Sequence, residues 1–213
     1  MTGRDFSRVS LGTDHVKAPE QDTSGESNEA AVWKDFKDGD EAAFVWIYKT
    51  YFETLYNYGH QFGFETEVIR DQIQELFIYL RNHRKQLGQV NSIKYYLYKS
   101  LRRRLIAASK KRFSFFPLAG LEHSNQFEIA FVKSTEVKLI ESLISEETSQ
   151  YLANSMKKLT PRQREAVLHF YYEGMSYKQT ADIMNFKEVK SVRKLIYRAI
   201  DALRKDLKGF KSR

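Results

Sequence analysis

The chain has 213 residues, a formal net charge of +8 and no cysteine, which excludes disulfide scaffolds, thiolate metal sites and cysteine nucleophiles. No apolar run approaches the roughly 20 residues that cross a bilayer, and the N-terminus lacks the basic-then-apolar layout of a signal peptide. We therefore expect a cytoplasmic protein without stable membrane insertion. The excess of basic over acidic residues favours an anionic partner. The chain has only 3 prolines but 15 Phe and 13 Tyr, which predicts an all-α chain with aromatic-rich cores.

Residues 1–28 are polar and rich in Ser, Thr, Gly and acidic side chains, a composition that predicts a disordered acidic tail. Apolar residues at three- and four-residue spacing then predict helices over about 44–56, 65–80 and 92–111. Gly59 and Gly63 break the first pattern, and Gly88 marks the loop before the third helix.

An acidic face is predicted on the second of these helices. Asp71, Gln74 and Glu75 lie three and four residues apart, so a helix places them on one connected face, which Phe77 anchors. Such a face can pair with a basic partner helix. The alternative is ordinary helix surface.

A basic segment follows directly. Between Arg81 and Arg112 there are eleven Lys or Arg residues and no Asp or Glu. Tyr95, Tyr96 and Tyr98 interleave with them, and basic side chains beside flat rings are what a surface for single-stranded nucleic acid requires. The alternative is a solvated basic helix face, because runs of charge are usually exposed.

The last quarter of the chain reads as a helix-turn-helix. Thr160-Pro161 is a strong helix start, Gly174 ends that helix, and Ser176 can cap a second one. A turn at Asn185-Phe186 precedes a third helix, whose basic side chains suit phosphates and guanine edges.

We therefore expect an all-α fold of two small helical domains joined by a flexible linker, the C-terminal one a winged-helix-like four-helix domain with a helix-turn-helix. The predicted segments are the tail (1–28), an N-terminal domain (29–112), a linker (113–134) and a C-terminal domain (135–213).

The order of these parts resembles that of the bacterial extracytoplasmic-function (ECF) sigma factors. The resemblance covers about residues 33–207 and is carried by residues 38–44 (DGDEAAF), 71–77 (DQIQELF), 92–99 (SIKYYLYK), 159–165 (LTPRQRE), 176–181 (SYKQTA) and 198–200 (RAI). It implies a factor without a catalytic site that binds core RNA polymerase and directs promoter recognition, melting and transcription initiation. It also implies an anti-sigma partner.

The resemblance also implies roles for individual residues. The polymerase-binding helix is expected to use Asp71, Gln74, Glu75 and Phe77. The minus-10 element is expected to contact Asn91, Ser92, Lys94, Tyr95, Tyr98, Lys99, Arg102, Arg103 and Lys110. The minus-35 element is expected to contact Arg162, Arg164, Lys187, Lys190, Ser191, Arg193, Lys194 and Tyr197.

Two other classes of function remain open. An autonomous helix-turn-helix regulator with an N-terminal sensing or dimerisation domain would share the C-terminal pattern, but it has no reason to place an acidic helix beside an acid-free basic one. An enzyme is disfavoured because the five histidines show no metal-ligand spacing with carboxylates. There is also no glycine-rich phosphate loop, so we expect no metal and no cofactor.

Overall fold

The computed structural model describes residues 23–60, 64–113 and 146–211, and side chains within 29–60, 64–109 and 150–207. Every regular element in these ranges is helical, which confirms the predicted fold class. The predicted linker lies outside the described residues except for Phe113. None of the described helices is long and apolar enough to cross a membrane.

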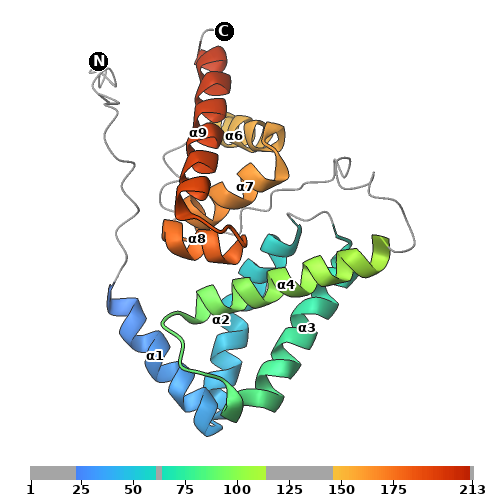
Figure 1. Cartoon of the computed structure of the whole chain (residues 1–213), viewed down its shortest axis with the longest axis vertical. Helices are drawn as coiled ribbons and strands as arrows, with labels where there is room; N and C mark the ends of the chain where they lie inside the picture. Colours follow the sequence, from blue (N-terminus) through green and yellow to red (C-terminus); the bar gives the residue numbers. More distant parts are fainter. Residues whose placement is uncertain (1–22, 61–63, 114–145, 212–213) are drawn as a thin grey trace.

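The N-terminal unit consists of α1 (Thr23–Asp38), α2 (Glu41–His60), α3 (Thr66–His83), a short 3-10 turn η1 (Arg84–Gln86) and α4 (Ile93–Phe113). In Figure 1, α4 crosses the ends of α2 and α3. Because α1 begins at Thr23, residues 23–28 are helical and the prediction of a disordered tail is wrong for them. The helix predicted over 92–111 agrees closely with α4.

Aromatic side chains fill the core of this unit. Trp33 is fully buried between Phe36 and Tyr96, with ring centroids 5.3 and 5.4 Å away. Its indole Nε1–H donates to the carbonyl of Gly88 at 3.0 Å. The indole thus packs α1 into the core and holds the loop that leads into α4.

Gly59 lies within the last turn of α2, where α2 and α3 approach closely. A Cβ at this position would lie 2.4 Å from Cγ2 of Ile69, a side chain that is fully buried. The absence of a side chain at residue 59 therefore lets the two helices pack.

We expect Gly59→Ala to lower the free energy of unfolding by about 1–3 kcal/mol, because overpacking outweighs the gain in helix propensity. Urea denaturation followed by circular dichroism measures the change. Gly88→Ala is the matched control, since a Cβ at Gly88 meets no atom within 4 Å. Equal stability of the two variants would contradict the close approach.

The C-terminal unit consists of α6 (Glu146–Lys158), α7 (Pro161–Val167), a π-helical segment η3 (Leu168–Tyr172), α8 (Tyr177–Ile183) and α9 (Val189–Lys211). The predicted helix over residues 160–173 thus changes to π-helix after Val167. Such π segments are rare and often occur at functional sites.

Sequence-predicted caps set the helix boundaries here. Thr160 and Ser176 each form a capping box, with Oγ1 of Thr160 accepting from the Gln163 amide and Oγ of Ser176 from the Gln179 amide. Gly174 and Asn185 both adopt positive φ, 66° and 57°, as the ends of helices require. The predicted helix starts at Thr160 and Ser176 and the predicted turns at Gly174 and Asn185 are therefore confirmed.

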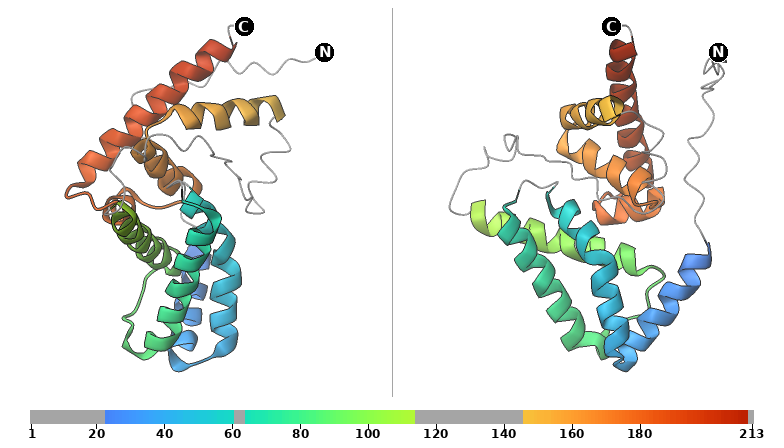
Figure 2. Two further views of the ribbon diagram at one scale, coloured as in Figure 1. Left: turned by 90° about the vertical axis from the view of Figure 1, so that its right-hand side faces the viewer. Right: turned by 180° about the vertical axis from the view of Figure 1, so that it is seen from behind.

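The two units pack against each other through α4 and α8, an arrangement that Figure 2 shows from one side and from behind. Met175 and Ile183 of the C-terminal unit are buried in the same hydrophobic cluster as the core of the N-terminal unit. The remaining core of the C-terminal unit forms two clusters of its own, to which α6, α7, η3, α8 and α9 all contribute.

Candidate nucleic-acid interface

The predicted minus-35 residues lie on α9 and the turn before it, except for Arg162 and Arg164, which lie on α7. These side chains are exposed in the structure: Arg162, Lys187, Lys190, Ser191, Arg193, Lys194 and Tyr197. Two of the cations lie over aromatic rings, Arg162 over Phe186 and Arg193 over Tyr177, each 5.0 Å from the ring centroid. The rings limit the orientations of these guanidinium groups while leaving them open to solvent.

Arg164 is the exception among these predicted contacts. Its side chain is buried and donates to the carbonyls of Met156, Lys157 and Leu159, each at 3.1 Å. These carbonyls lie at the end of α6, where the last turn lacks partners within the helix. The prediction that Arg164 contacts the DNA backbone is therefore wrong in this structure, because its donors serve the fold.

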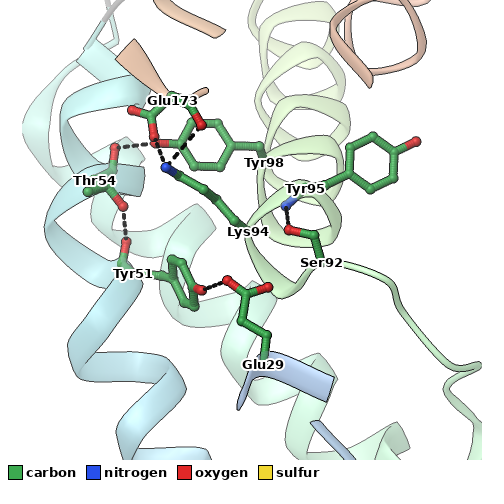
Figure 3. Close-up of polar contacts among 8 residues, drawn as sticks. All are labelled: Glu29, Tyr51, Thr54, Ser92, Lys94, Tyr95, Tyr98 and Glu173. Atoms are coloured by element: carbon green, nitrogen blue, oxygen red, sulfur yellow. Dashed lines mark hydrogen bonds and ion pairs between the residues drawn. The ribbon is translucent and has the colours of Figure 1, made fainter. Parts of the chain in front are cut away.

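The start of α4 is held by an acid from α1. Glu29 Oε2 accepts the amide N–H of Ile93 at 2.8 Å, and Glu29 Oε1 accepts the Tyr51 hydroxyl. Ser92 Oγ accepts the Tyr95 amide at 3.3 Å. Figure 3 shows the hydrogen bonds from Tyr51 to Glu29 and from Tyr95 to Ser92. The sequence analysis missed Glu29, which lies far from α4 along the chain.

The predicted minus-10 residues divide into two groups. Asn91 and Arg103 are exposed, and Ser92, Lys94, Tyr95 and Lys99 are partly exposed; Lys110 lies beyond the described side chains. Tyr98 and Arg102 are buried. In this arrangement Tyr98 and Arg102 are thus not accessible for the predicted contact with the minus-10 element.

Acidic side chains of the C-terminal unit cover the cations of α4. Lys94 Nζ lies 2.8 Å from Glu173 Oε2 (Figure 3), and Lys99 pairs with Asp182. Arg102 donates from Nε to Glu165 Oε1 at 2.6 Å and from Nη2 to Oε2 at 3.4 Å. The sequence analysis missed all three acids. They could have been identified because they are acidic residues in an otherwise basic helix-turn-helix.

Glu165 is at the centre of a buried cluster. Tyr58 donates its hydroxyl to Glu165 Oε1 at 2.9 Å, and His169 Nε2 lies 3.7 Å from the same oxygen. Burial alone would raise the pKa of the Glu165 carboxyl, but its contacts with His169 and Arg102 outweigh burial and lower the pKa to about 2. Burial, then the charge of Glu165, raises the pKa of Tyr58 well above its usual value, so the phenol keeps the proton that it donates.

The acidic face predicted on α3 is on the surface. Asp71, Gln74 and Glu75 are exposed, whereas Phe77 is buried in the core. Phe77 therefore supports this face from behind and is not itself a surface contact. Glu75 Oε2 lies 3.4 Å from Arg104 Nη1 on α4, an exposed pair.

One apolar residue extends that face. Ile78 is 49% exposed and follows Gln74 by one helical turn, so the face Asp71–Gln74–Glu75–Ile78 combines charge with an apolar anchor. The i, i+3, i+4, i+7 spacing could have identified Ile78. In the part of the chain that the structure describes, no group of three or more His, Asp or Glu residues could hold a metal ion.

Fold and site together define a two-unit helical protein with a helix-turn-helix. Residues 149–203, which lie within the C-terminal unit, match the family described as sigma-70, region 4. A comparison with curated protein sequences gave no match.

Solved structures share the fold, among them complexes of CnrH and of RpoE. CnrH in complex with the cytosolic domain of CnrY is 16% identical, with a TM-score of 0.54 over 85% of this chain and 97% of that chain. The sigma factor RpoE in complex with the anti-sigma factor NepR from Bartonella quintana is 18% identical, with a TM-score of 0.54 over 82% and 98%. At these identities the two structures show a fold that they share with this chain.

Proposed function

We propose that this chain is an ECF sigma factor that binds core RNA polymerase and directs promoter recognition, melting and transcription initiation. One observation supports the proposal: a match to sigma-70 region 4 lies in a chain whose fold is shared, over most of its length, with the solved sigma factor RpoE. The polymerase performs the chemistry, and the chain supplies promoter specificity without a catalytic site.

In this proposal, residues 29–112 form sigma region 2 and residues 135–213 form region 4, with 113–134 as the tether. The exposed acids of α3 dock on the polymerase, α4 holds the melted minus-10 strand, and α9 enters the major groove of the minus-35 element. Each unit alone binds weakly, and the tether raises the effective concentration of the second unit once the first is bound.

An anti-sigma factor is the proposed regulatory partner. One matched structure is a sigma factor held by a protein named as an anti-sigma factor, and the other is a complex with a cytosolic domain. Co-purification of this chain with a protein that blocks its transcription activity would support this partner.

Transcription in vitro tests the proposed function directly. Core polymerase, this chain and genomic DNA fragments should yield transcripts with defined start sites that core polymerase alone does not make. An autonomous regulator would instead bind DNA without directing initiation by core polymerase, and that result would overturn the proposal.

We expect Glu75→Lys to weaken binding to core polymerase about tenfold or more, because a reversed charge in a complementary interface is repulsive. The fold should be preserved, since Glu75 is exposed and its pair with Arg104 is a surface ion pair. Fluorescence titration of labelled chain with core polymerase gives the affinity. Glu53→Lys on α2 changes the charge equally at another exposed position; equal affinities for both variants would refute the α3 assignment.

A further inference from the structure

Helix α1 holds both ends of the loop 88–92, which leads into α4. At the start of the loop, the carbonyl of Gly88 accepts the indole N–H of Trp33 at 3.0 Å. Just after its end, the amide of Ile93, the first residue of α4, donates to Glu29 Oε2 at 2.8 Å. Glu29 and Trp33 are four residues apart in α1, so they lie one turn apart on the same helix face. One face of α1 therefore fixes where the loop begins and where it ends.

Both of these α1 side chains are themselves held by further contacts. The Trp33 ring is fully buried and packs on the rings of Phe36 and Tyr96. The second oxygen of the Glu29 carboxylate accepts the hydroxyl of Tyr51, a contact drawn in Figure 3. Neither side chain can leave its place without losing these partners. The two hydrogen bonds to the loop are therefore made by pre-positioned groups.

The side chains in and beside the loop divide into an inner and an outer set. Leu87 is buried and Val90 packs against the core cluster of the N-terminal unit, whereas Gln89 and Asn91 are exposed. A primary amide offers a donor and an acceptor side by side, and an unpaired base exposes edges that such groups recognise. The loop thus presents two amide side chains suited to a base from a backbone that is fixed on its inner side.

The charge at the start of α4 favours a base over a phosphate. The first turn of a helix has free N–H groups, which attract phosphates. Here Glu29 occupies the Ile93 amide, and Ser92 Oγ accepts the Tyr95 amide at 3.3 Å. The first turn of α4 has no acidic residue of its own, so the Glu29 carboxylate supplies the negative charge there. A phosphate is repelled from this end of α4, whereas the neutral edge of a base is not.

We propose that Glu29 and Trp33 of α1 are positioning residues that set the base preference of the loop 88–92 at one position of the minus-10 element. The exposed amides of Gln89 and Asn91 make the contacts with the base. The proposal rests on the proposed function. Hydrogen bonds to a base depend on distance and direction, whereas contacts with phosphates carry no sequence information. A displaced loop therefore loses discrimination between bases while the phosphate contacts of α4 remain, although neither α1 side chain touches DNA.

Hydrogen exchange of the full-length chain, followed by mass spectrometry, reports the α1 contact without DNA. Glu29→Ala removes the acceptor of the Ile93 amide, so the peptide that contains Ile93 should exchange about tenfold faster or more, as local opening predicts. Glu29→Gln keeps a side-chain oxygen that can accept this amide, and it should retain most of the protection. Unchanged exchange in Glu29→Ala would overturn the proposal.

Transcription in vitro on templates with single substitutions in the minus-10 element measures discrimination. The readout is the ratio of transcript from the parent promoter to transcript from each substituted one. In Asn91→Ala, Glu29→Ala and Trp33→Phe, this ratio should fall about tenfold at one shared position, as loss of a base contact predicts. Ratios for substitutions in the minus-35 element should not change. Glu29→Gln should retain most of the discrimination.

Gly59→Ala is the control for a general loss of stability, because it disturbs the contact of α2 with α3 in the same unit. It should lower transcription from all templates alike and leave every ratio unchanged. Loss of discrimination in this control, or faster exchange in Glu29→Ala with unchanged ratios, would overturn the positioning role. Failure of the wild-type chain to direct transcription would instead reject the sigma factor function, and the role of α1 with it.

Discussion

Replacing Arg164 by Ala is expected to destabilise the C-terminal unit by about 3 kcal/mol or more, because three carbonyl groups at the end of α6 lose a charged donor. For a unit of this size the midpoint of thermal unfolding should fall by about 10 °C or more. Circular dichroism melting of the full chain measures it. Arg164→Lys should recover only part of the loss, since an ammonium group lacks the planar fork of the guanidinium.

Arg162→Ala is the matched control. Arg162 lies in the same helix but is exposed, over the Phe186 ring, so its loss should leave the melting temperature within about 2 °C and weaken only DNA binding. If Arg164→Ala weakened DNA binding at unchanged stability, the buried structural role would be wrong and the sequence-based assignment to the DNA backbone would be restored.

The second expected result is a loss of stability in acid that depends on Glu165. The pKa of this carboxyl is lowered from 4.5 to about 2 in the folded chain. A lowered pKa stabilises the folded state above pH 4.5, and that stabilisation is lost as the pH falls from 4.5 toward 2. The contribution is on the order of 3 kcal/mol.

Urea denaturation of the wild type and of Glu165→Gln from pH 6 to pH 2.5 isolates this contribution. The variant should be the less stable form at pH 6, and the difference should shrink as the pH falls, because the wild-type carboxyl becomes neutral too. Glu53→Gln, at an exposed site, should give a difference that stays flat. A constant difference for Glu165→Gln would show that the charge of Glu165 does not stabilise the contact.

Local chemistry determined much of the fold. The Thr160-Pro161 and Ser176 caps, Gly174 and Asn185 are short-range signals, because each satisfies backbone groups within a few residues of itself. Likewise the spacing of Asp71, Gln74 and Glu75 already determined that they share one helix face, and the structure places all three on the surface. Burial of Phe77 is consistent with its role as an anchor but excludes it from direct contact.

Tertiary contacts determined the rest, because they join residues far apart in the chain. Glu29 at the start of α4, Trp33 at Gly88 and the role of Gly59 against Ile69 all depend on how helices pack. From the sequence alone, a basic residue at a helix start that binds DNA phosphates cannot be distinguished from one that binds backbone carbonyl groups. Only packing showed that Arg164 serves the end of α6.

The amino-acid sequence by itself determined the helices α2, α3, α4, α8 and α9, the caps of α7 and α8, the acidic face of α3 and the basic character of α4, since these follow from periodicity and local hydrogen bonding. Only the tertiary structure decided which cations of α4 are free, because the acids that pair with them are contributed by the other unit. Arg102 and Glu165 are 63 residues apart, and no local pattern relates them. Their pairing depends on the packing of the two units, which brings a buried guanidinium and a buried carboxylate together.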